Sequence, residues 1–172
     1  MILQADGSAS IVLIHFEVVT TIERYTDPAE RNREAGGILI GSYRGPHIEI
    51  VSCTSPMPQD IRTPVLFNRR DPGHDREAKR RWQESGRVQT FVGEWHTHPE
   101  KMPLPSRTDR VTWSAVMKSH APHSLVFLIR GFAGAWYGFG RAGVVTRFLP
   151  APTTDADNPA DILPVPIICV SP

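Results

Sequence analysis

Cysteine is scarce in this chain, and its scarcity limits the kinds of site the protein can build. Only Cys53 and Cys169 occur, far apart and outside any C-x-x-C pair. This spacing argues against a disulfide framework and against a thiolate metal site. Any metal ion would therefore be held by histidine and carboxylate side chains.

Long apolar runs and an excess of one charge are also missing. The apolar stretch nearest the N-terminus, residues 11–14, has no basic segment before it and is too short for a signal peptide or a membrane span. We therefore expect a cytoplasmic protein with no membrane partner. A formal net charge of +1 removes the strongest argument for a nucleic-acid partner, because phosphate binding normally requires a basic face.

Length and composition favour one globular domain followed by a tail. The chain has 172 residues, of which 40% are hydrophobic and 22% charged. We expect the domain to cover residues 1–150. Residues 151–172 are rich in proline, which forbids a long helix and suits an extended strap or a disordered end.

The order of apolar patterns predicts an α/β fold with a mixed sheet sandwiched by helices. Runs that are short and apolar or that alternate predict strands at 11–14, 37–43, 47–53, 90–95, 124–130, 135–139 and 143–149. Helical spacing predicts helices at about 18–25, 71–85 and 106–119. In the last of these, Val111, Ala115 and Val116 are expected to face inward.

Residues 93–99 read Gly-Glu-Trp-His-Thr-His-Pro and directly follow a predicted strand. His96 and His98 would point to the same side of an extended backbone and can share one ion. Asp109 follows at the start of a predicted helix, after a Pro-bounded loop that could bring its carboxylate to the same point. Two imidazoles and one carboxylate would leave one tetrahedral position open to water, as in catalytic zinc sites.

Each element of this pattern has a simpler interpretation. Ser106 and Asp109 form an S-x-x-D sequence that resembles a helix capping box, and an isolated H-x-H is more often solvated or part of a core. The ordered combination at this spacing favours a metal site.

The combined motif resembles the JAMM (JAB/MPN) metallopeptidases. Their signature is an upstream E-x-x-G-x-L-x-G, then H-[ST]-H-P, then S-x-x-D. This chain has these elements in order at 34–41 (Glu-Ala-Gly-Gly-Ile-Leu-Ile-Gly), 96–99 and 106–109. The resemblance covers about residues 10–150.

The resemblance implies a JAB/MPN-like (cytidine-deaminase-like) fold and Zn²⁺ held by His96, His98 and Asp109. It also implies that Glu34 moves protons and that the Ser106 hydroxyl stabilises the oxyanion. Without the resemblance, the sequence indicates only an ordinary surface carboxylate at Glu34. Glu94 is a rival, because on a strand it shares a face with His96. We expect Glu94 to contact ligands or substrate rather than to carry the proton.

The implied activity is hydrolysis of an amide or isopeptide bond at the C-terminal tail of a ubiquitin-like protein. The sequence around the H-x-H looks most like small bacterial members in anti-phage operons with cyclic-oligonucleotide signalling (CBASS), where the conjugated tail belongs to a nucleotidyltransferase. Alternatives are processing of a sulfur-carrier or ubiquitin-like precursor and a non-catalytic MPN-type binding module.

Other polar clusters look structural. Residues 69–81 carry charges of both signs, which is typical of a solvated helix face. His74, His120 and His123 have no ligand-like spacing with the main motif and are expected at the surface or at caps.

Overall fold

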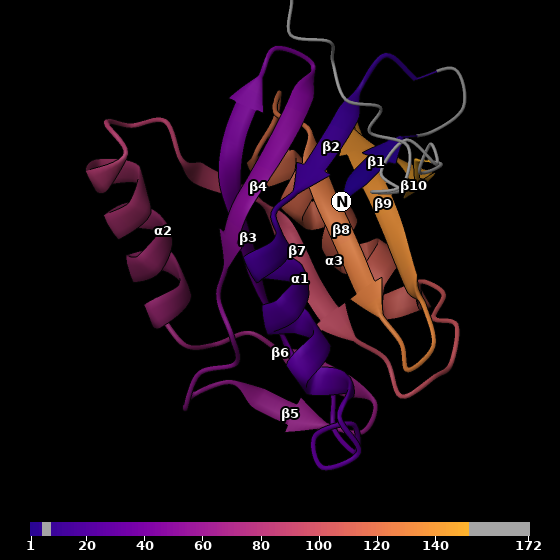
Figure 1. Ribbon diagram of the computed structural model, residues 1–172. Coiled ribbons are helices and arrows are strands. Elements are labelled where there is room, and N and C mark those ends of the chain that lie inside the picture. The colour runs from indigo at the N-terminus through magenta and orange to yellow at the C-terminus, as the bar shows by residue number, and fades with distance from the viewer. Residues whose placement is uncertain (5–7, 152–172) are drawn as a thin grey trace, which may run out of the picture.

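The computed structural model describes residues 1–4 and 8–151 (Figure 1). The strands in this part are β1 (Ile2–Gln4), β2 (Ile11–Ile14), β3 (Gly36–Arg44), β4 (His47–Cys53), β5 (Ile61–Thr63), β6 (Leu66–Asn68), β7 (Thr90–Thr97), β8 (Leu125–Arg130), β9 (Ala135–Arg141) and β10 (Val144–Pro150). The α-helices are α1 (Phe16–Glu23), α2 (Gly73–Glu84) and α3 (Arg107–Ser119), and a 3₁₀ turn covers Arg24–Thr26.

Eight of the strands form one mixed sheet in the order β1-β10-β9-β8-β7-β3-β4-β2. The sheet closes on itself because β1 pairs with both β10 and β2. The β2–β4 and β7–β8 pairs are parallel and the others antiparallel. The predicted α/β fold with a mixed sheet and helices on its faces is confirmed.

Alternate residues of β8 supply two separate cores. Val126 and Leu128 pack in the cluster that contains Val18 of α1, whereas Phe127 packs in the cluster that contains Trp113 of α3. This division follows from the two-residue period of a strand, which sends neighbouring side chains to opposite faces. Helices α1 and α3 therefore cover opposite sides of the sheet (Figure 1).

The prediction for the inward face of α3 was wrong for two of its three residues. Val111 and Ala115 are exposed, whereas Val116 is partly buried against the cluster that contains Trp113. The buried residues of this helix are Trp113 and Met117. Trp113 stacks on Phe127 with 4.6 Å between ring centroids. The large aromatic surface of Trp113 outweighs that of the smaller aliphatic side chains in setting the helix orientation.

A small hairpin, β5–β6, was not predicted from the sequence. It lies outside the main sheet, at the end toward which β7 runs (Figure 1). The segment between β4 and α2 carries it, and its two strands are joined by Pro64 and Val65.

No helix in residues 1–4 and 8–151 is long and apolar enough to span a membrane. The cytoplasmic location stays a prediction. The proline-rich tail lies outside the described residues, apart from Ala151, and so does Cys169.

Candidate active site

The end of β7 presents two histidines on one face. His96 and His98 are both buried, and their Nε2 atoms lie 3.0 Å apart. Thr97, between them, points to the other side, where its hydroxyl accepts a hydrogen bond from the Ala35 backbone N–H at 2.9 Å. The alternation of the strand thus directs both imidazoles to one point.

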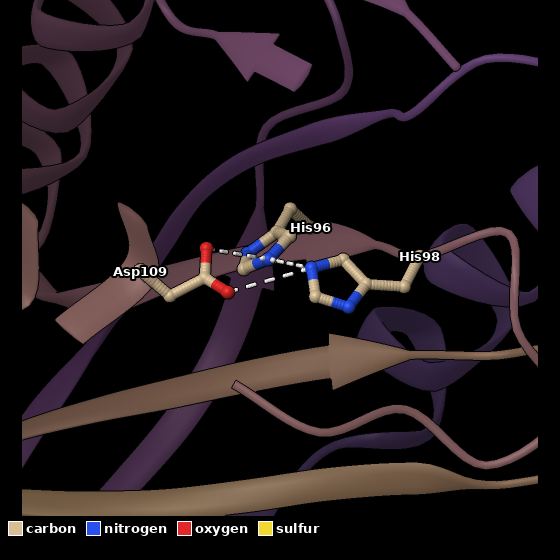
Figure 2. A group of neighbouring side chains, drawn as sticks. All are labelled: His96, His98 and Asp109. Atoms are coloured by element: carbon tan, nitrogen blue, oxygen red, sulfur yellow. Dashed lines mark hydrogen bonds and ion pairs between the residues drawn. The ribbon is translucent and has the colours of Figure 1, made fainter. Parts of the chain in front are cut away.

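Asp109 reaches the same point from the first turn of α3 (Figure 2). Its Oδ1 lies 3.2 Å from His96 Nε2, and its Oδ2 lies 3.5 Å from His98 Nε2. The Ser106 N–H donates to Asp109 Oδ2 at 2.6 Å, and the Asp109 N–H donates to Ser106 Oγ at 3.2 Å. The capping box weighed from the sequence is therefore present, and it holds the carboxylate against the histidines.

The donor atoms of the three residues lie close to the spacing of a tetrahedral metal ion. Bonds of about 2.0–2.2 Å place neighbouring tetrahedral ligands about 3.3–3.6 Å apart. The two Nε2 atoms lie 3.0 Å apart, and the two Asp109 oxygens lie 3.2 and 3.5 Å from them, so the shortest separations are a few tenths of an ångström below that range. One candidate ligand atom of each residue lies within 4.8 Å of the others. The residues therefore fit a metal ion with three protein ligands.

Glu34 lies in the same cleft, just before β3. Its neighbour Ala35 is tied to Thr97 in both directions, because the Thr97 N–H also donates to the Ala35 carbonyl at 2.8 Å. Gly36 then pairs with His96 across the β3–β7 ladder. The spacing in E-x-x-G thus brings Glu34 beside the histidines, and all the predicted site residues line one cleft: Glu34, His96, His98, Ser106 and Asp109.

Burial and neighbouring charges shift the carboxyl groups of this cleft in different directions. Burial raises the pKa of Glu34, although His96 and His98 oppose the shift. Burial would also raise the pKa of Asp109, but hydrogen bonds from the two histidines outweigh it and hold that pKa far below its usual range. Asp109 therefore carries a negative charge and is suited to bind a cation, whereas Glu34 is suited to take up and return a proton.

Glu94 lies on the same face of β7 and also lines the cleft. Burial raises the pKa of its carboxyl group, and the nearby Arg69 guanidinium opposes the rise. The shortest distance between the Arg69 and Glu94 charged groups is 4.0 Å. Glu94 thus faces Arg69 and the Trp113 indole.

The hairpin forms part of the wall of the cleft, and sequence reasoning missed its contribution. Pro64, Val65, Leu66 and Phe67 line the cleft together with Arg69, and Thr112 and Val116 of α3 line it too. The Phe67 backbone lies beside the Glu34 carboxylate and opposes the rise of its pKa. Pro64, which precedes the apolar run of residues 65–67, was the available turn signal.

His74 was also misjudged. It was expected at the surface or at a cap, but its side chain is fully buried. The solvated face of α2 is confirmed by exposed ion pairs, for example Arg80 with Glu77 and Glu84, both at 2.6 Å. His120 caps α3, and His123 is exposed.

Comparison with known proteins agrees with this geometry. A profile of prokaryotic homologues of the JAB domain matches residues 18–146. A Vibrio cholerae protein named CD-NTase/cGAS isopeptidase is 34% identical over 143 residues, which cover 83% of this chain and 90% of that protein. A probable metalloprotease from Sinorhizobium fredii is 29% identical over 119 residues, covering 66% of this chain and 73% of the relative.

A protein from Desulfitobacterium hafniense, solved in solution, has the same fold with a TM-score of 0.55. The match covers 79% of this chain and 88% of that one, at 20% identity. Fold, cleft and sequence similarity agree, and this chain belongs to the family of prokaryotic JAB domains, as a peptidase of the JAMM type.

Proposed function

We propose that this protein is a zinc-dependent isopeptidase that releases the C-terminal tail of a CBASS nucleotidyltransferase, or of a ubiquitin-like protein, from a second protein. One observation carries the proposal: His96, His98 and Asp109 converge in a cleft that also holds Glu34. Support for the substrate comes from the Vibrio cholerae relative, whose name describes an isopeptidase of CD-NTase or cGAS.

Zinc is the metal that this donor set favours. Two imidazoles, one carboxylate and one open position are typical of catalytic zinc. Zinc bound there would supply a Lewis acid that polarises a carbonyl and lowers the pKa of a water to about 7.

Glu34 would move the protons. Its carboxylate takes a proton from the attacking water and passes it to the departing amine, a type of help worth about a hundred- to ten-thousand-fold in rate. The Ser106 hydroxyl accepts from the Asp109 N–H, so its own proton is free to be donated to the oxygen of the scissile carbonyl.

The cleft suits an extended chain. It has a volume of about 580 Å³, which accommodates a few residues of peptide and excludes a folded domain. The exposed side chains of Val65 and Leu66 provide apolar contacts along it. A flexible tail would enter while the folded body of the modifier stays outside.

The test is a panel of fusion proteins. We expect zinc-loaded protein to cut just after the last residue of the nucleotidyltransferase tail in a tail–protein fusion, and to cut ubiquitin-like fusions in the same way if their tails fit. A fusion to a folded protein that lacks such a tail serves as the control and should stay intact.

Two results would contradict the proposal. Broad cutting of unfolded casein without preference for a junction would indicate a general metalloprotease. Tight binding of the tail with no cleavage by zinc-loaded protein would indicate a binding module instead.

A further inference from the structure

A chain of buried hydrogen bonds lies between α2 and the main sheet, outside the cleft. His74 of α2 contacts Asp60 Oδ2 through Nε2 at 2.8 Å and Thr54 Oγ1 through Nδ1 at 2.6 Å. The side chains of His74 and Asp60 are both 0% exposed. Burying three polar side chains is costly unless each is hydrogen-bonded. The partners of these side chains therefore show which elements the hydrogen-bond network connects.

The carboxylate fixes the direction of one of these hydrogen bonds. An ionised carboxylate only accepts, so His74 Nε2–H donates to Asp60, and in the neutral imidazole Nδ1 then accepts from the Thr54 hydroxyl. Thr54 Oγ1 in turn accepts from the Ile38 backbone N–H at 2.9 Å. Burial would raise the pKa of Asp60, but hydrogen bonds from Asp71, Met57 and His74 outweigh it and keep the group ionised.

Asp60 links the two ends of the segment that carries the hairpin. These ends, at Met57 and at Arg70 and Asp71, are called the hairpin neck below. Its carboxylate accepts from the Met57 N–H at 2.7 Å on one side of the hairpin. On the other side it accepts from the Arg70 and Asp71 N–H groups at 2.9 and 3.0 Å. One carboxylate thus ties both ends of the segment, with β5 and β6 between them.

Thr54 connects this neck to the two strands of the active site. Its hydroxyl accepts from Ile38 of β3, and its carbonyl accepts from the Trp95 indole N–H of β7 at 2.9 Å. Trp95 directly precedes His96. The network of hydrogen bonds therefore extends from the hairpin neck to the backbone beside the candidate ligands.

The hairpin itself holds the Glu34 backbone at two points. The Glu34 N–H donates to the Thr63 carbonyl at 2.8 Å, and Arg62 Nε donates to the Glu34 carbonyl at 2.9 Å. The Phe67 backbone also lies beside the Glu34 carboxylate and opposes the rise of its pKa. The place of that carboxylate in the cleft therefore depends on the place of the hairpin.

We infer that Asp60, His74 and Thr54 are positioning residues, which act through the β5–β6 hairpin to set the Glu34 carboxylate and one wall of the cleft. Their effect on turnover rests on the proposed function, whereas their effect on the hairpin does not. None of the three lines the cleft. A displacement of about 1 Å at a reacting group costs about a hundred-fold in rate, so a loosened hairpin lowers kcat without removing any group that reacts.

The test compares Thr54→Val with Thr54→Ser in the full chain. Valine has nearly the same shape but removes the hydroxyl, and serine keeps the hydroxyl. We expect Thr54→Val to speed hydrogen exchange at residues 61–69 and at the Glu34 amide, and to lower kcat about ten- to a hundred-fold, more than it changes KM. Zinc content stays unchanged, and Thr54→Ser restores both readouts.

Two further variants separate positioning from simple loss of stability. Asp60→Asn breaks the chain at its other end and should give the same local pattern if Thr54→Val fails to fold. Phe148→Leu is the matched control, since Phe148 is buried on β10, three places from β7 in the strand order, where it stacks on Phe139 of β9. It should lower global stability while kcat and hairpin exchange stay near wild type.

The inference is overturned if exchange at 61–69 is the same in Thr54→Val and wild type, or rises equally in Phe148→Leu. It is also overturned if the hairpin loosens and kcat is unchanged. A wild-type protein that cuts no fusion would contradict the proposed substrate instead, and exchange at the Glu34 amide would still decide the positioning role.

Discussion

Two buried carboxyl groups, Glu34 and Glu94, share the cleft, and burial raises the pKa of both. Their partners differ. Glu34 faces His96 and His98, whereas Glu94 faces Arg69 and Trp113. The pKa direction alone does not separate their roles, and we propose from their partners that Glu34 transfers the proton and that Glu94 makes contacts.

We predict that Glu34→Gln lowers kcat by about a hundred- to ten-thousand-fold, because the amide cannot accept the proton of water. Zinc content and thermal stability should stay at the wild-type level. Glu94→Gln is the matched control and should keep most of the turnover. If the effects of the two variants were exchanged, the proton would travel through Glu94.

Asp60 gives a prediction about stability and pH. Its folded-state pKa is lowered, so its contribution to stability is complete above the unfolded value, 3.8, and is lost as the pH falls through the folded value. Asp60→Asn should therefore lower the free energy of unfolding by about 2 kcal/mol at pH 7. Denaturant titrations should show this difference shrinking below about pH 3.8. A constant difference from pH 7 down to pH 2 would contradict the role of the charge.

At the scale of elements, the parts that sequence reasoning found are those with a local pattern. The strand before His96 and the helix after Ser106 both have clear periodicity or caps, and the site motif lies on them. The hairpin was missed because β5 and β6 have three residues each and are held by Asp60 and His74 rather than by their own pattern. Closure of the sheet, through Leu3 opposite Pro150, joins residues too far apart for any local signal.

The bulge in β7 gives a prediction at the same scale. Gly93 has φ +148°, and a Cβ there would overlap the carbonyl of Val126 on β8. The β3–β7 register shifts at this point, opposite Leu39. Gly93→Ala should therefore lower the free energy of unfolding by about 3 kcal/mol, since it adds backbone strain to a steric clash.

Gly45→Ala is the control for that measurement. Gly45 also has a positive φ, +62°, but a Cβ there would meet nothing within 4 Å. Its cost should be about 1 kcal/mol. Equal losses for the two variants in urea titrations would show that backbone conformation alone matters and that the approach of β8 does not.

At the scale of the whole molecule, the candidate metal site joins β7 to α3. His96 and His98 come from the sheet, and Asp109 comes from the helix that covers one of its faces. An ion held by all three would bind the folded protein and not the unfolded chain. Metal binding and global stability should therefore be linked.

We predict that zinc raises the melting temperature of metal-stripped protein. Free zinc at a hundred times its dissociation constant contributes about 2.7 kcal/mol, which for a chain of this size corresponds to about 5–10 °C. Elemental analysis should find about one zinc per chain.

The His96→Ala, His98→Ala double variant should lose both the metal and the shift in melting temperature, because one carboxylate cannot hold the ion. Glu34→Gln should keep both, because Glu34 is not a ligand. Undiminished zinc in the double variant, or a melting temperature that zinc leaves unchanged in the wild type, would place the metal elsewhere and remove the basis for the proposed hydrolysis.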